Sequence, residues 1–335
     1  MADPVRLPLL TNSRAKAFRR CARFHLHAYQ EGYRPIEKAA ALGFGGLFHH
    51  MLEAWLLAEP ELRVEAALAK LEEKGTDLNE FDRIRLQELM LGYDARWGDE
   101  PIAVERVEAQ FECELRNPES GAASRTWKLG GKVDAIVTRD GRPWLMEHKT
   151  TGDDISPGST YWRKLRIDSQ VSTYFLGAAS LGYDVEGCIY DVIRKPKLQR
   201  LEATPQESRK YKKDGTLYAS QRDVDESPEE FRERFRAYVG DHLLDLFQRG
   251  DVTRVEDDLA DAGFDLWQTA RLIREAELAG RHPRNPDACF QWSRECEYFG
   301  VCTGAATLDD TTRFRKVESA NEELDNAADP ATAAE

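Results

Sequence analysis

The sequence predicts an α/β protein in which helices flank a central mixed sheet, and three observations support this class. Apolar residues recur at helical spacing through the first hundred residues and again beyond residue 228. Between these regions, apolar and polar residues alternate over 104–115, 127–138 and 143–150, which is the pattern of half-buried strands. A helical pattern at 167–181 and a strand pattern at 185–193 then supply the crossover that a mixed sheet needs.

The other helices are expected from their apolar periodicity and their caps. The first has Ser13 as its N-cap, because a serine hydroxyl accepts a hydrogen bond from an amide of the first turn. The run GGLFHHMLEAWLLA, which starts at Gly45, is apolar enough to be buried. The expected helices span 13–30, 45–58, 79–97, 228–248 and 258–280.

Composition excludes several classes of protein. The chain has 335 residues, of which 41% are hydrophobic, so it can build a core and is not globally disordered. No apolar run approaches the roughly 18 residues of a membrane span, and the first residues lack the apolar stretch of a signal peptide. Six cysteines in such a chain argue against a disulfide framework. We therefore expect a cytoplasmic globular protein.

The net charge of −13 does not exclude a polyanionic partner, because local patches decide that question. Basic residues gather in the segments 14–23, 163–166 and 194–213, which are candidates for phosphate contacts. Ordinary solvated faces are the alternative interpretation. The candidates for stacking on bases, or else for ordinary packing, are Tyr161, Trp162 and Tyr211.

We expect one domain over residues 1–304. Within it, the segment 195–228 is polar, basic and rich in turn residues, which predicts a mobile insertion. The segment 305–335 carries eight acidic and three basic residues with few large apolar ones. This composition predicts an acidic disordered tail.

Two acidic residues are expected to meet at a β-hairpin. Asp140-Gly141 between two alternating runs indicates a two-residue turn, and that turn places Asp134 directly opposite Glu147, with Lys149 on the same face. Like charges opposed across strands are destabilising, so the pair needs a partner. Carboxylate oxygens suit Mg²⁺ or Mn²⁺. The alternative is a solvent-facing pair that neighbouring lysines screen.

Two sets of residues at helical spacing could complete such a site. Gly45, His49 and Glu53 recur every four residues, so they share one face of their helix. Gln170 and Tyr174 are likewise four residues apart. Taken alone, the histidine is more typical of a packed core position, and the second pair carries little information.

The ordered series resembles the PD-(D/E)XK nuclease superfamily, and within it most closely the RecB-like exonuclease branch. That branch includes the AddB nuclease domain, the nucleases of CRISPR adaptation and many phage-encoded nucleases. The resemblance runs from about Ser13 to Cys302, and the proline that often precedes the first acid is Val133 here. It implies a restriction-endonuclease-like core. The motifs that carry it are Gly45-x₃-His49-x₃-Glu53, Gly131-x₂-Asp134, Glu147-x-Lys149 and Gln170-x₃-Tyr174.

The resemblance also implies a catalytic centre that uses Mg²⁺ or Mn²⁺. Lys149 would orient or activate the attacking water, while Gln170 and Tyr174 would position the lysine or the scissile strand. The implied metal ligands are His49, Asp134, Glu147 and the backbone carbonyl of His148.

The implied activity is hydrolysis of DNA phosphodiester bonds, as an exonuclease on single strands or duplex ends. The implied setting is recombination, repair or phage DNA processing, in a bacterial cytoplasm or that of a phage host. A second copy of the chain, or a recombination or CRISPR-adaptation protein, would be the partner. The alternative is a nucleic-acid-binding or assembly module whose nuclease centre is vestigial.

Four cysteines form a second candidate metal site. Cys289, Cys296 and Cys302 follow the spacing C-x₆-C-x₅-C, and Cys21 lies on the first expected helix. On spacing alone, zinc, an iron–sulfur cluster and buried free thiols all stay open, although zinc sites favour C-x₂₋₄-C pairs. The resemblance implies a [4Fe-4S] cluster on these four residues, tying the ends of the domain together. Most members of the branch space the last three as C-x₂-C-x₅-C, so Cys289 departs from the pattern.

Overall fold

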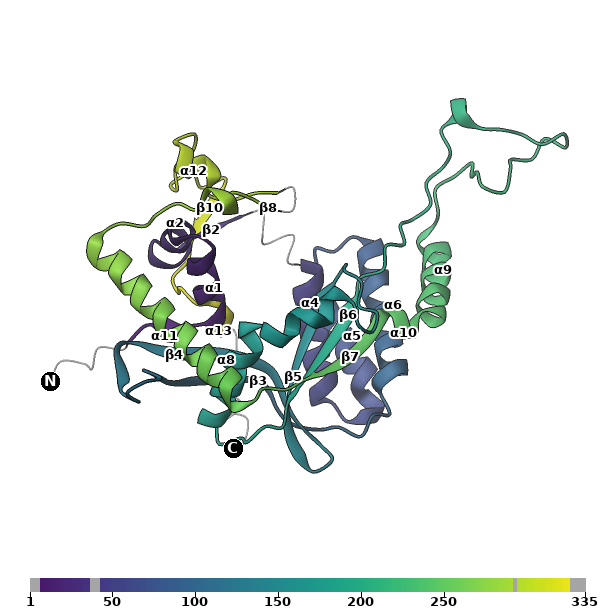
Figure 1. The fold of residues 1–335 in the computed structure, drawn as a ribbon. Coiled ribbons are helices and arrows are strands. Elements are labelled where there is room, and N and C mark those ends of the chain that lie inside the picture. Colours follow the sequence, from purple (N-terminus) through teal and green to yellow (C-terminus); the bar gives the residue numbers. More distant parts are fainter. Residues whose placement is uncertain (1–6, 37–42, 292–293, 326–335) are drawn as a thin grey trace.

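A computed structural model describes residues 7–36, 43–291 and 294–325, and a mixed sheet forms its centre (Figure 1). In this part of the chain the main sheet has six strands in the order β1-β4-β5-β6-β7, with β3 also paired to β4. β5 and β6 run parallel, whereas β3 with β4, β4 with β5 and β6 with β7 are antiparallel. The predicted α/β class with a central mixed sheet is confirmed. The strands are β1 (Leu9–Leu10), β3 (Ala103–Arg116), β4 (Ala123–Arg139), β5 (Arg142–Thr151), β6 (Cys188–Arg194) and β7 (Phe247–Val252).

One face of the sheet packs against a group of helices that includes α4 and α6 (Figure 1). Phe48, Met51 and Trp55 of α4 are buried and share a core with Ala135 and Met146 of the sheet. Their spacing of three and four residues gives α4 one continuous apolar side, as its sequence predicts. The helices of this layer are α4 (Gly43–Leu57), α5 (Arg63–Lys74), α6 (Glu80–Trp97), α9 (Pro228–Asp241) and α10 (Leu243–Leu246).

The opposite face of the sheet is covered by a second layer that joins the two ends of the chain. Val171 and Phe175 of α8 share a core with Val133 and Leu145 of the sheet. α1 and α11 lie beside each other in this layer, although they are far apart in the sequence (Figure 1). The helices here are α1 (Asn12–Arg20), α7 (Thr160–Lys164), α8 (Ser169–Ser180) and α11 (Glu256–Ala279).

The β4–β5 hairpin has the register that the sequence predicts. Arg139 pairs with Arg142, and the ladder continues to the pair Ala135 and Met146. Asp140 and Gly141 have φ values of 54° and 75°, which fits a type I′ turn whose twist matches the strands. Asp134 and Glu147 are therefore the first residues beyond the last pair of this ladder.

The alternation of side chains breaks at Asp134. In a regular strand, residues two apart share a face, yet Val133 packs under α8 and Ala135 packs under α4. These two residues therefore lie on opposite faces of the sheet. On the neighbouring strand, Val107 pairs with Ala135 and Ala109 pairs with Val133, which leaves Glu108 opposite Asp134. Glu108 has a left-handed φ of 51°, so the sheet is locally distorted at the first acid.

The first expected helix is broken rather than continuous. α1 ends at Arg20, Cys21 is extended with φ −167° and ψ 120°, and the chain resumes as the short helices α2 (Ala22–His25) and η1 (Leu26–Gln30). The N-cap is Thr11 rather than Ser13, because the Thr11 side chain accepts from the backbone amide of Arg14 at 3.2 Å.

The strand β7 and the helix α5 were not expected from the sequence. The range predicted as the helix 228–248 contains α9, α10 and the start of β7, and α5 lies in a stretch with no prediction. β7 is an edge strand that reads FQRGDV, so it has little apolar alternation to reveal it. A Cβ on Gly250 would come within 2.6 Å of the Trp162 ring, which accounts for glycine in this strand.

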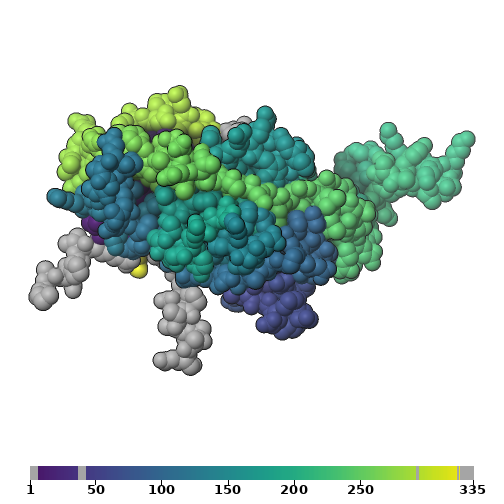
Figure 2. All heavy atoms as spheres, turned by 60° about the horizontal axis from the view of Figure 1, so that its bottom comes forward, coloured from purple at the N-terminus to yellow at the C-terminus, as the bar shows by residue number. Residues whose placement is uncertain are grey.

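The segment predicted as an insertion forms an arm between β6 and α9 that projects from the body of the molecule (Figures 1 and 2). Its two limbs run side by side, with the amide of Thr204 donating to the carbonyl of Arg222 at 2.8 Å. Near its tip the amide of Lys212 donates to the carbonyl of Thr216 at 2.7 Å. Gly215 takes the left-handed φ of 82° that this reversal requires.

The segment 305–335 was expected to be disordered. This is wrong for residues 314–316, which form a strand paired with residues 33–35. Phe314 is buried and its ring stacks on Tyr298 with 5.6 Å between centroids. The rest of the expected tail, 326–335, lies outside the described residues. The small elements of the cysteine-bearing end and its surroundings are β2 (Tyr33–Pro35), η5 (Pro286–Ala288), β8 (Phe290–Gln291), β9 (Arg294–Glu295), α12 (Phe299–Thr303), β10 (Phe314–Lys316) and α13 (Glu322–Asp325).

A separate finding concerns membranes. Across the described ranges, every helix is too short or too polar to pass through a lipid bilayer.

Candidate active site

Glu147 lies at the centre of the candidate site, on β5 just beyond the hairpin ladder. The residue is only 1% exposed, and its Oε1 accepts hydrogen bonds from Lys149 Nζ and, at 2.8 Å, from Gln170 Nε2. Its Oε2 is buried and has no hydrogen-bond partner among the described residues. A buried carboxylate oxygen without a partner is costly, so this atom marks a place where a further ligand fits.

Asp134 stands beside this carboxylate at the distorted position of β4. Its Oδ2 accepts from the backbone amide of His148 at 2.8 Å and lies 3.7 Å from Nδ1 of His49. Burial alone raises the pKa of Asp134, but the charges of His49, Lys149 and His148 outweigh it and hold the pKa below its usual value. Asp134 is therefore the ionised member of the pair.

The electrostatics of Glu147 differ from those of its neighbour. Burial, and next the charge of Asp134, raise the pKa of Glu147 to about 7, although Lys149 opposes both effects. Burial lowers the pKa of Lys149, but the carboxylates of Glu147 and Asp134 outweigh it and raise the pKa overall. The site therefore holds a permanent ammonium group beside two carboxylates that repel each other.

His49 reaches the carboxylates because α4 approaches β5 closely. A Cβ on Gly45, one turn earlier, would lie only 2.8 Å from Thr150 Oγ1, so a side chain there would push the helix away. Burial lowers the pKa of His49 to about 4, which leaves a neutral imidazole at physiological pH. Glu53, the third residue of the stripe, instead lies 3.5 Å from His50 Nδ1.

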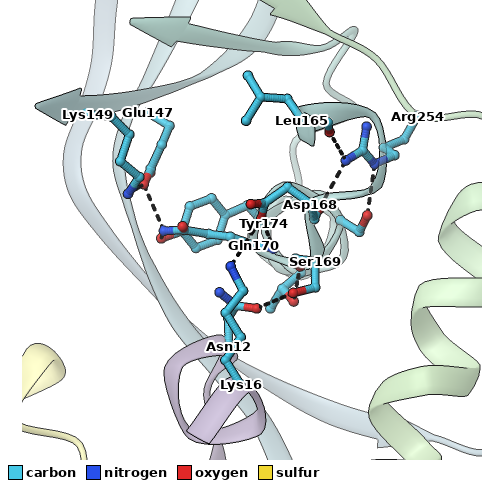
Figure 3. A network of polar contacts seen from close by, with 12 residues as sticks. Asn12, Lys16, Glu147, Lys149, Leu165, Asp168, Ser169, Gln170, Tyr174 and Arg254 are labelled. Carbon is cyan, nitrogen blue, oxygen red and sulfur yellow. Dashed lines mark hydrogen bonds and ion pairs between the residues drawn. The ribbon is translucent and has the colours of Figure 1, made fainter. Parts of the chain in front are cut away.

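Gln170 and Tyr174 meet the β4–β5 hairpin from α8 (Figure 3). The Gln170 amide, which donates to Glu147, lies 2.6 Å from the hydroxyl of Tyr174. Burial raises the pKa of Tyr174 well above its usual value, so it stays protonated. Asp168 caps α8 by accepting from the backbone amide of Gln170 at 2.7 Å.

The start of α8 is fixed from two directions (Figure 3). Arg254 donates from its guanidinium to the carbonyls of Leu165 and Asp168, at 2.9 and 3.1 Å, and to the hydroxyl of Ser172 at 2.8 Å. From α1, Asn12 accepts from Ser169 Oγ at 2.8 Å. These contacts hold the helix that presents Gln170 to Glu147.

A buried polar network lies behind the hairpin, on the face of the sheet opposite Glu147. His148 Nδ1 is 2.8 Å from Oδ2 of Asp191, which also accepts from the hydroxyl of Tyr93 at 2.6 Å. Arg249 donates to that hydroxyl at 2.8 Å and lies 3.2 Å from the other oxygen of Asp191. Sequence analysis missed this network, although an aspartate inside the apolar strand CIYDVIR was a usable signal.

The residues fit a hard divalent cation by their chemistry. Asp134 and Glu147 offer carboxylate oxygens, one of them without a partner, and His49 offers a neutral imidazole nitrogen. In this structure, however, the side chains are not gathered closely enough for metal binding: among residues 7–36, 43–291 and 294–325, no group of three His, Cys, Asp or Glu side chains could hold a metal ion. A cation here would need the backbone carbonyl or water as further ligands.

Two groups of candidate DNA contacts have internal roles instead. Arg14 is buried, donates to His25 Nε2 at 3.3 Å and stacks on the Trp127 ring at 4.5 Å. Arg19 donates to Thr269 Oγ1 at 2.9 Å. The Trp162 indole donates to the carbonyl of Ile155 at 2.8 Å, and its half-buried ring packs against the core. The expectation that Arg14 contacts phosphate is therefore wrong, whereas base stacking by Trp162 stays a prediction.

The structure brings the four candidate cluster cysteines into one region. Burial raises the pKa of the Cys302 thiol against the opposing charge of Arg23, and the thiols of Cys296, Cys21 and Cys289 add smaller effects in the same direction as burial. The amide of Cys296 donates to the carbonyl of Cys289 at 2.7 Å, which links two of these segments. All four are free cysteines of intermediate exposure.

The chain is similar to known proteins at the level of family. A family model described as the PD-(D/E)XK nuclease superfamily matches residues 10–303. The search of curated proteins finds no match.

Two solved structures are also similar. A protein from Eubacterium rectale, provisionally described as an exonuclease, has 9% identity and a TM-score of 0.42, with 89% of this chain and 88% of that chain covered. The protein SSO0001 has 11% identity and a TM-score of 0.23, with 60% and 69% covered.

Proposed function

Because the chain belongs to the PD-(D/E)XK nuclease superfamily, we propose that it is a Mg²⁺- or Mn²⁺-dependent deoxyribonuclease, acting as an exonuclease of the RecB-like and AddB-like branch. One observation carries the proposal most directly. Glu147 is buried beside Asp134 with one oxygen unpartnered, while its other oxygen is held by Lys149 and Gln170. A vestigial centre would have little reason to keep this costly arrangement.

The metal ligands would be His49, Asp134, Glu147 and the backbone carbonyl of His148. When bound, a divalent cation acidifies water, polarises a phosphoryl oxygen and offsets negative charge. The neutral imidazole of His49 and the ionised carboxylate of Asp134 are both in the protonation state that such binding needs.

Lys149 would stabilise the negative charge that develops at the phosphorus and orient the attacking water. Its raised pKa keeps the ammonium charged, and it lies beside the Glu147 carboxylate. Gln170 would hold Glu147 in place through its 2.8 Å hydrogen bond, and Tyr174 would hold Gln170. The two α8 residues are in this view positioning residues.

We also propose that Cys21, Cys289, Cys296 and Cys302 hold a structural [4Fe-4S] cluster. The backbone amide of Asn285 contacts Cys21 Sγ at 3.4 Å, and the amide of Cys296 donates to the carbonyl of Cys289 at 2.7 Å. These contacts support a common site that joins the N-terminal and C-terminal segments. Linking segments so far apart would restrict the unfolded chain and stabilise the fold by roughly 5 kcal/mol, by analogy with a disulfide. An anaerobic preparation should be brown with broad visible absorbance, and a colourless protein with one bound zinc would contradict the cluster.

The proposed substrate is DNA, as single strands or duplex ends, in recombination, repair or phage DNA processing in the cytoplasm. Partners would be a second copy of the chain or a recombination or CRISPR-adaptation protein. The chemistry of the site requires only a phosphodiester, so the process is proposed from the resemblance to the RecB-like branch rather than from the geometry.

The test is hydrolysis of end-labelled linear single-stranded and duplex DNA. Wild-type protein with Mg²⁺ or Mn²⁺ should shorten the labelled strand, and chelation with EDTA should stop the reaction. Glu147→Gln should be inactive while remaining folded. Tight DNA binding without any product under all these conditions would favour the alternative, a binding or assembly module with a vestigial centre.

A further inference from the structure

The arm formed by residues 195–227 has its charges sorted along its length. At its base the acidic residues are paired: Asp225 lies 3.0 Å from Arg200, and Glu226 lies 2.6 Å from Arg234. Glu226 also accepts from the backbone amide of Leu201 at 2.8 Å. These contacts attach the base of the arm firmly to α9.

The tip of the arm is basic instead. The sequence Arg209-Lys-Tyr-Lys-Lys213 places four bases in five residues of a chain whose net charge is −13. In the described part of the chain, Lys210, Lys212 and Lys213 have no carboxylate within ion-pair distance, and all three are exposed. The one acid of the tip, Asp214, accepts instead from the amide and hydroxyl of Thr216 at 3.0 and 2.7 Å.

Two aromatic side chains accompany these lysines. Tyr211 is 57% exposed and Tyr218 is 51% exposed. Their strands are held together, because the amide of Tyr218 donates to the carbonyl of Lys210 at 3.3 Å and Tyr211 pairs with Leu217 across the tip. Large aromatic rings gain by burial, so two exposed rings beside unpaired cations indicate a surface that binds something.

We propose that this tip, residues 210–218, is a binding site for single-stranded DNA. Lysines pair with phosphates, and exposed aromatic rings stack on bases, which is the combination that single strands engage. Duplex DNA offers the phosphates but keeps its bases stacked, so it would leave the two tyrosines unused. The inference rests on the proposed nuclease function for its substrate class.

The tip also lies away from the catalytic hairpin, since the arm projects from the body (Figures 1 and 2). An extended chain spans at most about 3.3 Å per residue, so the reach from Lys195 to the tip is at most about 60 Å. At about 3.4 Å per nucleotide, a strand of about 40 nucleotides could touch both the site and the tip. A strand of about 6 nucleotides spans only about 20 Å, so it should engage the catalytic site without the tip.

The experiment measures binding of a fluorescent oligothymidine of about 40 nucleotides by anisotropy over a salt series, in full-length protein carrying Glu147→Gln. Replacing the three lysines by Lys210→Gln, Lys212→Gln and Lys213→Gln should weaken binding about tenfold and lower the slope of log K against log[salt] by about 2. Tyr211→Ala with Tyr218→Ala should weaken binding about tenfold and leave the slope unchanged.

A matched control removes three exposed arginines elsewhere, as Arg125→Gln, Arg271→Gln and Arg274→Gln. Those changes should alter binding less than twofold. An equal loss in this control, an equal loss by the tyrosine variant on duplex DNA of the same length, or unchanged binding by either tip variant would overturn the proposal.

The cleavage reaction separates this inference from the proposed function. With Glu147 intact, the tip variants should hydrolyse a strand of about 6 nucleotides at the wild-type rate and a strand of about 40 nucleotides with a raised KM. An inactive wild-type protein would contradict the nuclease function but leave the binding result standing. A tip variant that loses activity equally on both lengths would overturn the arm site.

Discussion

The side chain of His148 is hydrogen-bonded to Asp191 in the buried network, while its backbone amide contacts Asp134 of the candidate site. Its Nδ1 lies 2.8 Å from Oδ2 of Asp191, and its backbone amide donates to Asp134 at 2.8 Å. Burial lowers the pKa of His148, but the bond to Asp191 outweighs it and the pKa ends above its usual value. One residue therefore links the buried network to the candidate site.

Asp191→Asn should destabilise the protein and slow catalysis together. The substitution removes a charge that is fully buried between His148 and Arg249, so the free energy of unfolding should fall by about 3 kcal/mol. The kcat should fall more than KM rises, because the backbone of His148 would lose its anchor. Urea unfolding and steady-state kinetics measure the two effects.

The same substitution at Asp251 is the control. Asp251 is an exposed partner of Arg139 at 2.6 Å in the same sheet, so Asp251→Asn should cost less than about 1 kcal/mol and leave kcat unchanged. Equal effects at both positions would contradict the role given to Asp191.

Glu147→Gln should stabilise the metal-free protein. The pKa of about 7 means that the fold disfavours the ionised carboxylate, so at pH 8 the neutral amide should gain about 3 kcal/mol of unfolding free energy. Added Mg²⁺ should then stabilise the wild type and not the variant, as urea unfolding with and without the ion would show. Equal stabilisation of both proteins by Mg²⁺ would place the ion elsewhere.

The hairpin and its two acidic residues could be predicted from the sequence, because their positions depend only on residues that are close together in the chain. A two-residue Asp-Gly turn fixes the register, and the register places Asp134 and Glu147 at the same end of the ladder. Lys149 then follows from the period of the strand, whereas His49 and Gln170 join the site only through the family resemblance, because a four-residue spacing alone carries little information. The distortion at Asp134 and Glu108 has no local signature, because it depends on how two strands pass between two helical layers.

Other features depend on contacts between distant segments. Arg14 lies among other basic residues in the sequence, which suggests an exposed side chain. Only the fold shows that it stacks on Trp127. Phe314 lies in a stretch rich in acids and alanine, yet it is buried against Tyr298. β7 is recognisable only by its pairing with β6, since its own sequence has weak alternation.

Gly177→Ala should destabilise the protein, because the added methyl group would clash with the ring of Phe111. A Cβ at this position would lie 2.4 Å from the Phe111 ring, which is buried, so the unfolding free energy should fall by about 2 kcal/mol. Gly263→Ala is the matched helical control, because a Cβ there meets nothing within 4 Å and should add up to about 1 kcal/mol. Thermal unfolding of both variants, with Phe111→Leu as partial rescue of the first, checks the mechanism.

The stability of the protein should fall as pH drops below about 6.5, through His25. Burial, and next the charge of Arg14, lower the pKa of this histidine to about 3 in the folded state. Between these pH values the unfolded chain binds a proton that the folded chain does not, so acidification favours unfolding by up to about 4 kcal/mol. His25→Phe should flatten this part of the curve of unfolding free energy against pH; an unchanged slope would contradict the assignment.

The most direct measurement is the number of Mn²⁺ ions bound per chain, which is obtained from the paramagnetic signal of the ion that stays unbound. The account predicts that wild-type protein binds Mn²⁺ at a site that is lost in both Asp134→Asn and Glu147→Gln, while Asp251→Asn binds as the wild type does. Undiminished Mn²⁺ binding after either change at the hairpin would contradict a shared cation between the two carboxylates.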